Sequence, residues 1–126
     1  MKIQESAENY LETILILSQK KTNVRSIDIA TELGFSKPSV SVAMKNLRNN
    51  DLIIVDEDGH IHLTPSGLAI AAKIYERHTL ISKLLIQLGV NEKTAIEDAC
   101  RIEHVISSES FEAIKNHAAA MSREEG

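Results

Sequence analysis

The stretch VRSIDIATELGFSKPSVSVAMKNL, residues 24–47, decides the fold of the N-terminal part of this chain. Ser26 is placed to cap a short helix, and Gly34 supplies the C-terminal stop of that helix. Ser36 is placed to cap a second helix, with Pro38 in its first turn, where the missing N–H of proline costs little. Two helices joined by a short turn that contains glycine predict a helix-turn-helix.

Two β-prone runs follow this stretch, at residues 52–55 and 60–63. The Asp58-Gly59 pair between them is a strong signal for a hairpin turn. His60 and His62 alternate in the second run, so they share one face of the strand, where we expect them to be exposed to solvent. A hairpin directly after a helix-turn-helix predicts a winged helix. A further helix is expected upstream, at about residues 5–20.

The C-terminal half predicts three more helices. Thr64 and Pro65 are placed to begin a long helix, and Asn91 and Ser107 are placed to cap the two that follow. The expected spans are 65–88, 92–104 and 108–119. The long helix has apolar residues on two faces, so we expect it to be buried partly against a second copy of the chain, as in a homodimer.

The composition favours a cytoplasmic protein that does not enter a membrane. No apolar run approaches the length of a membrane span, and the N-terminus lacks the apolar region of a signal peptide. Cys100 is the only cysteine, so it cannot form an intrachain disulfide. A reducing compartment would keep its thiol available to a metal.

Charge is distributed unevenly along the chain, although the formal net charge is −4. Residues 1–50 carry seven Lys and Arg against five Asp and Glu, whereas residues 51–64 carry four acids and no Lys or Arg. A surface that binds an anion is therefore expected in the first fifty residues.

A thiol, a carboxylate and an imidazole recur at i, i+3 and i+4 in Cys100, Glu103 and His104. Side chains at this spacing are neighbours on a helix, so one metal ion could contact all three. An alternative interpretation remains open, in which Cys100 is a small buried hydrophobe and Glu103 and His104 form a solvated edge.

These motifs together resemble the diphtheria-toxin-repressor family of metal-dependent transcriptional regulators, which includes a manganese-responsive branch. The matching segments are AENYLETI (7–14), the stretch 24–47, LT (63–64), RH (77–78) and EDACRIEHVIS (97–107). The resemblance implies a mainly α fold, with a winged helix-turn-helix DNA-binding domain at 1–72 and a helical dimerisation and metal-binding domain at 73–126. The SH3-like domain of the larger members has no counterpart in the sequence.

The resemblance carries two metal sites onto this chain. The primary site of the iron-type members maps to Asn9, Cys100, Glu103 and His104. A second site of the manganese branch maps to Glu12, His78 and Glu103. Asn9 stands where the iron branch has Met and the manganese branch has Asp, and its amide oxygen is a competent neutral ligand. Because the Cys100 thiolate is a soft ligand, we expect Fe(II) to be favoured, with Mn(II), Co(II) or Zn(II) as further candidates.

The DNA-reading surface is expected at the N-terminal part of the second helix of the helix-turn-helix, which enters the major groove in such proteins. The expected DNA contacts are Arg25, Ser36, Lys37, Pro38, Ser39, Ser41, Val42 and Lys45. The basic residues among them suit phosphates, and the hydroxyl and apolar residues suit base edges. A homodimer would bind a palindromic operator. The acidic residues 56–58 are expected to keep the wing off the DNA backbone.

Three functional hypotheses follow. The leading one is a metal-responsive, homodimeric repressor of metal-uptake genes, without catalytic residues or a small organic substrate. The second is a winged-helix dimer whose metal site has decayed. The third is a small zinc-dependent hydrolase. The third is the weakest, because the chain has neither an HExxH motif nor an evident general base.

Overall fold

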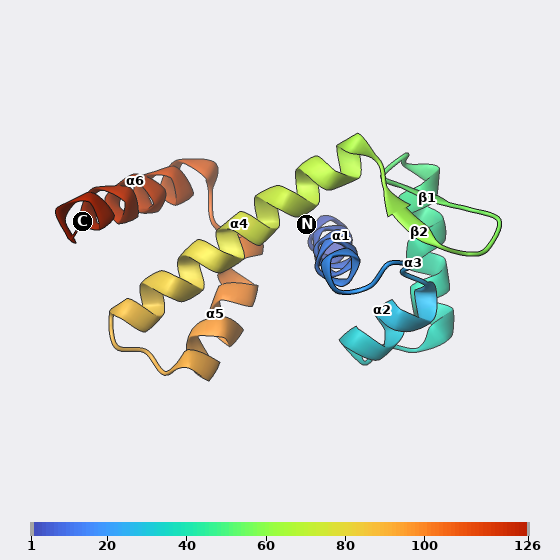
Figure 1. The fold of residues 1–126 in the computed structure, drawn as a ribbon, viewed down its shortest axis with the longest axis horizontal. Helices are drawn as coiled ribbons and strands as arrows, with labels where there is room; N and C mark the ends of the chain where they lie inside the picture. The colour runs from blue at the N-terminus through green and yellow to red at the C-terminus, as the bar shows by residue number, and fades with distance from the viewer. Residues whose placement is uncertain (1, 126) are drawn as a thin grey trace. The chain divides into compact units, whose positions relative to one another are not determined.

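The computed structural model describes the backbone of residues 2–125 and the side chains of residues 6–121. Its elements, labelled in Figure 1, are α1 (Lys2–Lys20), α2 (Ser26–Leu33), α3 (Lys37–Asn49), β1 (Ile53–Val55), β2 (Ile61–Leu63), α4 (Pro65–Gln87), α5 (Glu92–Val105) and α6 (Ser108–Glu125). The mainly α class with a small hairpin is confirmed. The chain divides into two compact units, Met1–Lys73 and Ile74–Gly126, with the boundary inside α4.

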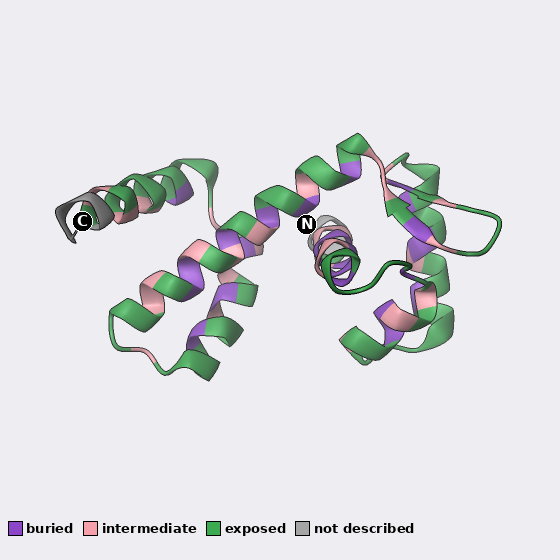
Figure 2. Ribbon diagram, in the orientation of Figure 1, coloured by how far each residue is buried: buried purple, intermediate pink, exposed green. Residues whose placement is uncertain are grey.

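The first unit has one hydrophobic core, to which α1, α2, α3 and the hairpin all contribute. Leu11 and Ile14 of α1 are fully buried in it. The predicted apolar stripe of α3, Val40, Met44 and Leu47, packs into the same core, and the opposite side of α3 is exposed (Figure 2). The helical spacing of apolar residues therefore identified the buried face of α3 correctly.

The ends of the helices in the helix-turn-helix follow local chemistry. Gly34 adopts the left-handed conformation with φ of 70°, and the Ser36 side chain accepts a hydrogen bond from the Ser39 N–H, as predicted. The predicted cap of α2 is wrong by one residue. Arg25 occupies the cap position, because its backbone N–H donates to the Asp28 carboxylate at 2.9 Å, and Ser26 is the first helical residue.

The wing is an antiparallel hairpin in which Ile54 pairs with His62. Each strand begins one residue later than predicted. The Ile61 N–H also donates to the Val24 carbonyl at 2.7 Å, so the segment before α2 is hydrogen-bonded to the hairpin. This bond attaches the wing to the helix-turn-helix.

The second unit begins within α4 and contains α5 and α6. Asn91 and Ser107 cap α5 and α6 as predicted, by accepting hydrogen bonds from backbone N–H groups. Helix α6 continues to Glu125, beyond the predicted end near residue 119. The core of this unit is small and consists of Ile81, Ala99 and Phe111 with partly buried neighbours. Within the described residues, no helix is long and apolar enough to cross a membrane.

Candidate metal centre and nucleic-acid interface

Three side chains of metal-ligand type meet in the second unit. His78 of α4 lies beside Cys100 and Glu103 of α5, and one ligand atom of each lies within 4.8 Å of the others. The His78 Nδ1 is 2.9 Å from Glu103 Oε2 and 3.7 Å from Cys100 Sγ. The helical spacing of Cys100 and Glu103 accounts for their proximity, whereas His78 reaches the cluster through the packing of α4 on α5.

These separations fit a shared divalent ion. Ligand bonds of about 2.1 Å for nitrogen or oxygen and about 2.3 Å for sulfur put two ligands of one ion roughly 3.0–3.6 Å apart. The 2.9 Å between His78 and Glu103 and the 3.7 Å between His78 and Cys100 fall close to the two ends of this range. Thiolate, imidazole and carboxylate together form a donor set suited to a transition metal.

Glu103 is the centre of the cluster. Its side chain is only 1% exposed, and its second oxygen, Oε1, lies 3.3 Å from His104 Nε2. A buried carboxylate is costly unless it is paired, and here an imidazole lies against each oxygen. The alternative interpretation is therefore wrong on both points, since Glu103 is buried and Cys100 is exposed.

Asn9 and Glu12, the remaining predicted ligands, belong to α1 in the first unit. They are three residues apart, so they share one side of that helix. Glu12 is buried and Asn9 is of intermediate exposure. Their participation in metal binding stays a prediction from the resemblance.

The buried, positively charged side chain of Arg77, which is next to the cluster residue His78 in the chain, was not predicted from the sequence. Arg77 precedes His78 on α4 and is only 6% exposed. A signal for it was present, because Ile74, Arg77 and Ile81 follow one another at helical spacing. All three are buried, so the guanidinium lies on the apolar stripe of α4.

Helix α3 presents an exposed face in the first unit, opposite its buried stripe. Val42 is 61% exposed, although the same helix contributes Val40, Met44 and Leu47 to the core. Every residue predicted to contact DNA is exposed, namely Arg25, Ser36, Lys37, Pro38, Ser39, Ser41, Val42 and Lys45. These side chains are therefore accessible to a ligand, and their contacts with DNA stay a prediction.

Two of the predicted DNA contacts already hydrogen-bond to each other. The Ser36 hydroxyl donates to the Ser39 hydroxyl at 2.8 Å while it accepts from the Ser39 N–H. Ser36 is thus occupied as the cap of α3. The Ser39 hydroxyl can still donate its own hydrogen, so it is the better candidate for a base contact.

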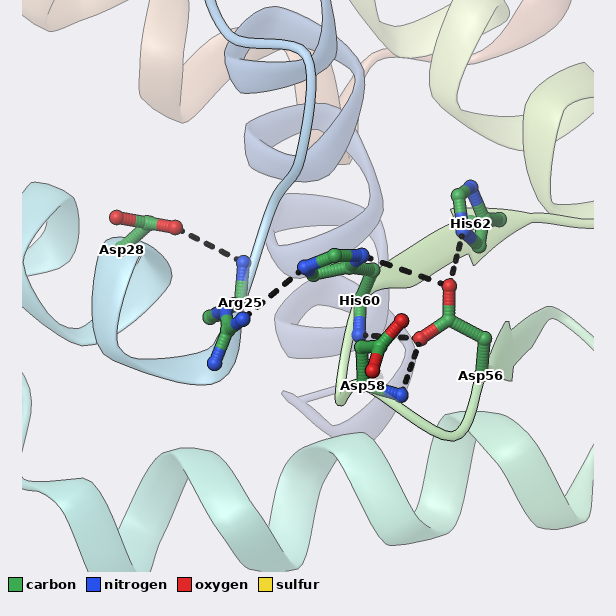
Figure 3. Close-up of polar contacts among 6 residues, drawn as sticks. All are labelled: Arg25, Asp28, Asp56, Asp58, His60 and His62. Carbon is green, nitrogen blue, oxygen red and sulfur yellow. Dashed lines mark hydrogen bonds and ion pairs between the residues drawn. The ribbon is translucent and has the colours of Figure 1, made fainter.

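Arg25 links the start of α2 to the wing. Its Nη2 lies 3.2 Å from His60 Nε2, and its backbone N–H donates to Asp28 (Figure 3). His60 is consequently only 16% exposed, contrary to the prediction, whereas His62 is exposed as predicted. The guanidinium of Arg25 is oriented by the wing.

Asp56, one of the acidic residues of the wing, has a structural role in the turn of the hairpin. One carboxylate oxygen accepts hydrogen bonds from the N–H groups of Asp58 and His60, each at 2.9 Å, and the other lies 3.2 Å from His62 Nε2 (Figure 3). The bond from the His60 backbone is the main cause that lowers the pKa of Asp56 below its usual value. These contacts shape the turn. They explain why side-chain atoms of Asp56, Asp58 and His60 lie within 4.8 Å of one another.

The fold and the ligand cluster define a winged-helix protein with a helical metal-binding part, and comparison with known proteins identifies its family. Residues 2–61 match the model "Iron dependent repressor, N-terminal DNA binding domain", and residues 64–124 match "Iron dependent repressor, metal binding and dimerisation domain". The chain belongs to this family, which includes the diphtheria toxin repressor and the MntR regulators.

Individual relatives support the same assignment. The chain is 32% identical over 112 residues to the transcriptional regulator MntR of Escherichia coli O6:H1, covering 89% of this chain and 72% of MntR. It is 31% identical over 106 residues to the diphtheria toxin repressor of Corynebacterium diphtheriae, covering 83% and 47% of the two chains. The solved structure of the manganese regulator SloR superposes with a TM-score of 0.80 at 29% identity, covering 90% of this chain and 53% of SloR.

The chain therefore spans about half the length of the diphtheria toxin repressor and of SloR. The relatives are metal-dependent transcriptional regulators, and the family consists of repressors rather than enzymes. The hydrolase hypothesis is accordingly dropped.

Proposed function

We propose that this chain is a cytoplasmic, homodimeric regulator that a divalent metal activates to bind a palindromic operator and repress metal-uptake genes. The observation that carries the proposal is the grouping of His78, Cys100 and Glu103 within 4.8 Å of one another. Residues 1–72 act as the DNA-binding domain and residues 73–126 as the dimerisation and metal-sensing domain. When bound, the ion supplies positive charge that offsets the Cys100 thiolate and the Glu103 carboxylate.

The proposed ligands are the residues that the resemblance implied, namely Asn9, Glu12, His78, Cys100, Glu103 and His104. Fe(II) is the proposed physiological metal, because a thiolate favours softer ions whereas Mn(II) prefers oxygen ligands. The paired substitution Cys100→Glu with Asn9→Asp should therefore shift activation from Fe(II) toward Mn(II). Anaerobic titrations that monitor DNA binding measure this shift. Equal activation of the unmodified protein by both ions would contradict the preference.

Exposed apolar side chains in the second unit support the homodimer. Leu88 and Val105 are each 73% exposed, and Ile86 and Ile96 are more than 40% exposed. The three-residue buried core of this unit leaves such side chains without cover. Association of two copies would bury them, and burial of apolar surface is the dominant favourable contribution to most protein association. Sedimentation of a monomer at micromolar concentration, with and without metal, would contradict this part of the proposal.

Contacts to phosphate and contacts to bases can be separated on α3. Lys45→Ala should weaken binding to specific and random DNA alike and reduce the salt dependence by roughly one unit of slope. Val42→Ala should instead change the preferred bases, because an apolar side chain reads the thymine methyl. Lys93→Ala, which removes an exposed lysine of α5 in the second unit, is the matched control and should leave DNA binding unchanged. Loss of general affinity alone in Val42→Ala would refute the assigned reading face.

The deciding experiment is a metal-dependent shift of DNA from the protein's own promoter region. Cys100→Ala and His78→Ala should abolish the response to metal but preserve binding to random DNA at low salt. His117→Ala, which removes an exposed histidine of α6, should respond like the unmodified protein. Binding of the operator without any metal, unchanged in Cys100→Ala, would favour the alternative of a winged-helix dimer with a decayed site.

A further inference from the structure

Arg77 reaches from α4 to the end of α5. Its Nη1 donates to the Glu103 carbonyl at 3.1 Å and to the Ile106 carbonyl at 3.0 Å. The guanidinium carbon lies 5.4 Å from the centre of the Phe111 ring, at the start of α6. One buried side chain thus contacts three successive parts of the second unit.

The environment of Arg77 explains how a charge is tolerated there. The last carbonyls of a helix have no partner within the helix, and that end carries partial negative charge. Helix α5 ends at Val105, so the carbonyls of Glu103 and Ile106 belong to its last turn and to the residue after it. The Phe111 ring adds an attractive face for a cation. Arg77 therefore stabilises the C-terminal end of α5.

We propose that Arg77 is a positioning residue for the metal centre. It carries no acceptor atom and cannot be a ligand itself. It holds the main chain of Glu103, whose carboxylate belongs to the cluster, and it adjoins His78, the ligand on α4. Loss of a group that orients a ligand in this way typically lowers metal affinity about 10- to 100-fold. This inference rests on the proposed metal-binding function.

The direction in which metal affinity changes when Arg77 is replaced distinguishes a positioning role from two simpler roles. Removal of a positive charge beside a metal site should strengthen cation binding if electrostatic repulsion alone operates. A role confined to core packing should lower thermal stability and leave the affinity of the folded protein unchanged. Positioning predicts weaker metal binding and a changed ligand geometry in protein that is still folded.

The experiment is an anaerobic titration of the full chain with Co(II). Binding is monitored through the thiolate-to-Co(II) charge-transfer band and the d–d absorption bands of the bound ion. Arg77→Met, which retains length but has no donor, should weaken Co(II) binding roughly 10- to 100-fold and alter the d–d bands. Arg77→Lys retains the charge without the planar fork, so it should give an intermediate affinity. Ile81→Val is the matched control in the same small core and should lower the melting temperature without changing Co(II) affinity.

The outcomes distinguish this inference from the proposed function. Failure of the unmodified protein to bind Co(II) through its thiolate would refute the metal-binding function itself. Normal binding by the unmodified protein, with equal or tighter binding and the same spectrum in Arg77→Met, would refute positioning alone. If Arg77→Met does not fold, Arg77→Lys decides, and an affinity and spectrum identical to those of the unmodified protein would overturn the inference.

Discussion

Replacement of Glu103 with glutamine removes the negative charge at the centre of the cluster with almost no change of shape. The Glu103 carboxylate lies 2.9 Å from His78 Nδ1 and 3.3 Å from His104 Nε2. The amide of glutamine has one acceptor and one donor group, so it can pair with both imidazoles in suitable tautomers. We therefore expect the free energy of unfolding without metal to change by less than about 1 kcal/mol.

The metal-bound protein should respond very differently. A metal present at about 100 times its Kd stabilises the unmodified protein by about 2.7 kcal/mol. For a chain of 126 residues that unfolds cooperatively, this corresponds to a rise in Tm of about 10 °C. Loss of the anionic ligand should weaken binding by roughly 100-fold or more, since loss of a mere orienting group already costs 10- to 100-fold. The same metal concentration should then raise the Tm of Glu103→Gln by no more than about 2 °C.

The assay is thermal unfolding followed by circular dichroism at the helical band, with and without Co(II), under anaerobic reducing conditions. Glu97→Gln is the matched control, because Glu97 is an exposed carboxylate on the same helix. It should melt like the unmodified protein in both conditions. A full metal-induced shift in Glu103→Gln would show that Glu103 does not hold the ion. A large loss of stability without metal would show that its carboxylate has a structural role instead.

Two further predictions concern the first unit. A Cβ added at Gly67 would lie 2.0 Å from the Leu52 carbonyl oxygen, so Gly67→Ala should lower the free energy of unfolding by about 1–3 kcal/mol in urea titrations, and unchanged stability would contradict this close approach. The hydrogen bond from Lys21, followed by that from the Arg25 N–H, lowers the pKa of Asp28 below its ordinary 3.8. A lowered pKa means that the charged form stabilises the fold above that ordinary value and that this contribution is lost as the pH falls through the folded-state pKa. Asp28→Asn should therefore destabilise by less than about 1 kcal/mol at pH 7, and the difference should shrink as the pH falls below the ordinary 3.8 and be lost through the lower folded-state pKa.

The helix boundaries were predictable where local chemistry fixes them. Gly34, Ser36 and Asn91 end or begin helices through their own backbone conformation or through a side chain that caps a nearby N–H. The start of α2 was misplaced by one residue. The cap residue is Arg25, and the side chain that bonds its backbone N–H belongs to Asp28, inside the helix. A serine in the adjacent position offered an equally plausible cap, and the sequence alone does not rank the two.

The metal cluster was predictable only in part from spacing. Cys100 and Glu103 are adjacent because a helix brings i and i+3 together, which holds for any packing of α5. His78 is separated from them by 22 and 25 residues, so its place in the cluster depends on how α4 packs on α5. The resemblance to a known family supplied this information, which periodicity does not contain.

The wing shows a different limit of prediction from sequence, which concerns the role of acidic residues in a loop. Residues 56–58 are expected to repel phosphate, and the structure adds a second role for Asp56, whose carboxylate is hydrogen-bonded to the turn and lies against His62. Residues in an acidic loop look alike in sequence whether they are solvated or serve the turn. The distinction arises from hydrogen-bond geometry across the hairpin, which only the structure provides.

Glu103 is held at its side chain and at its main chain by two consecutive residues of α4. His78 contacts its carboxylate, and Arg77 contacts its carbonyl. Consecutive residues of a helix point about 100° apart, and here they contact two different atoms of one residue. The order Arg77-His78 therefore matters as much as the presence of the histidine. An exchange of the two residues would direct the imidazole toward the carbonyls and the guanidinium toward the carboxylate. The resulting Arg–Glu ion pair would occupy the carboxylate and compete with any metal for it.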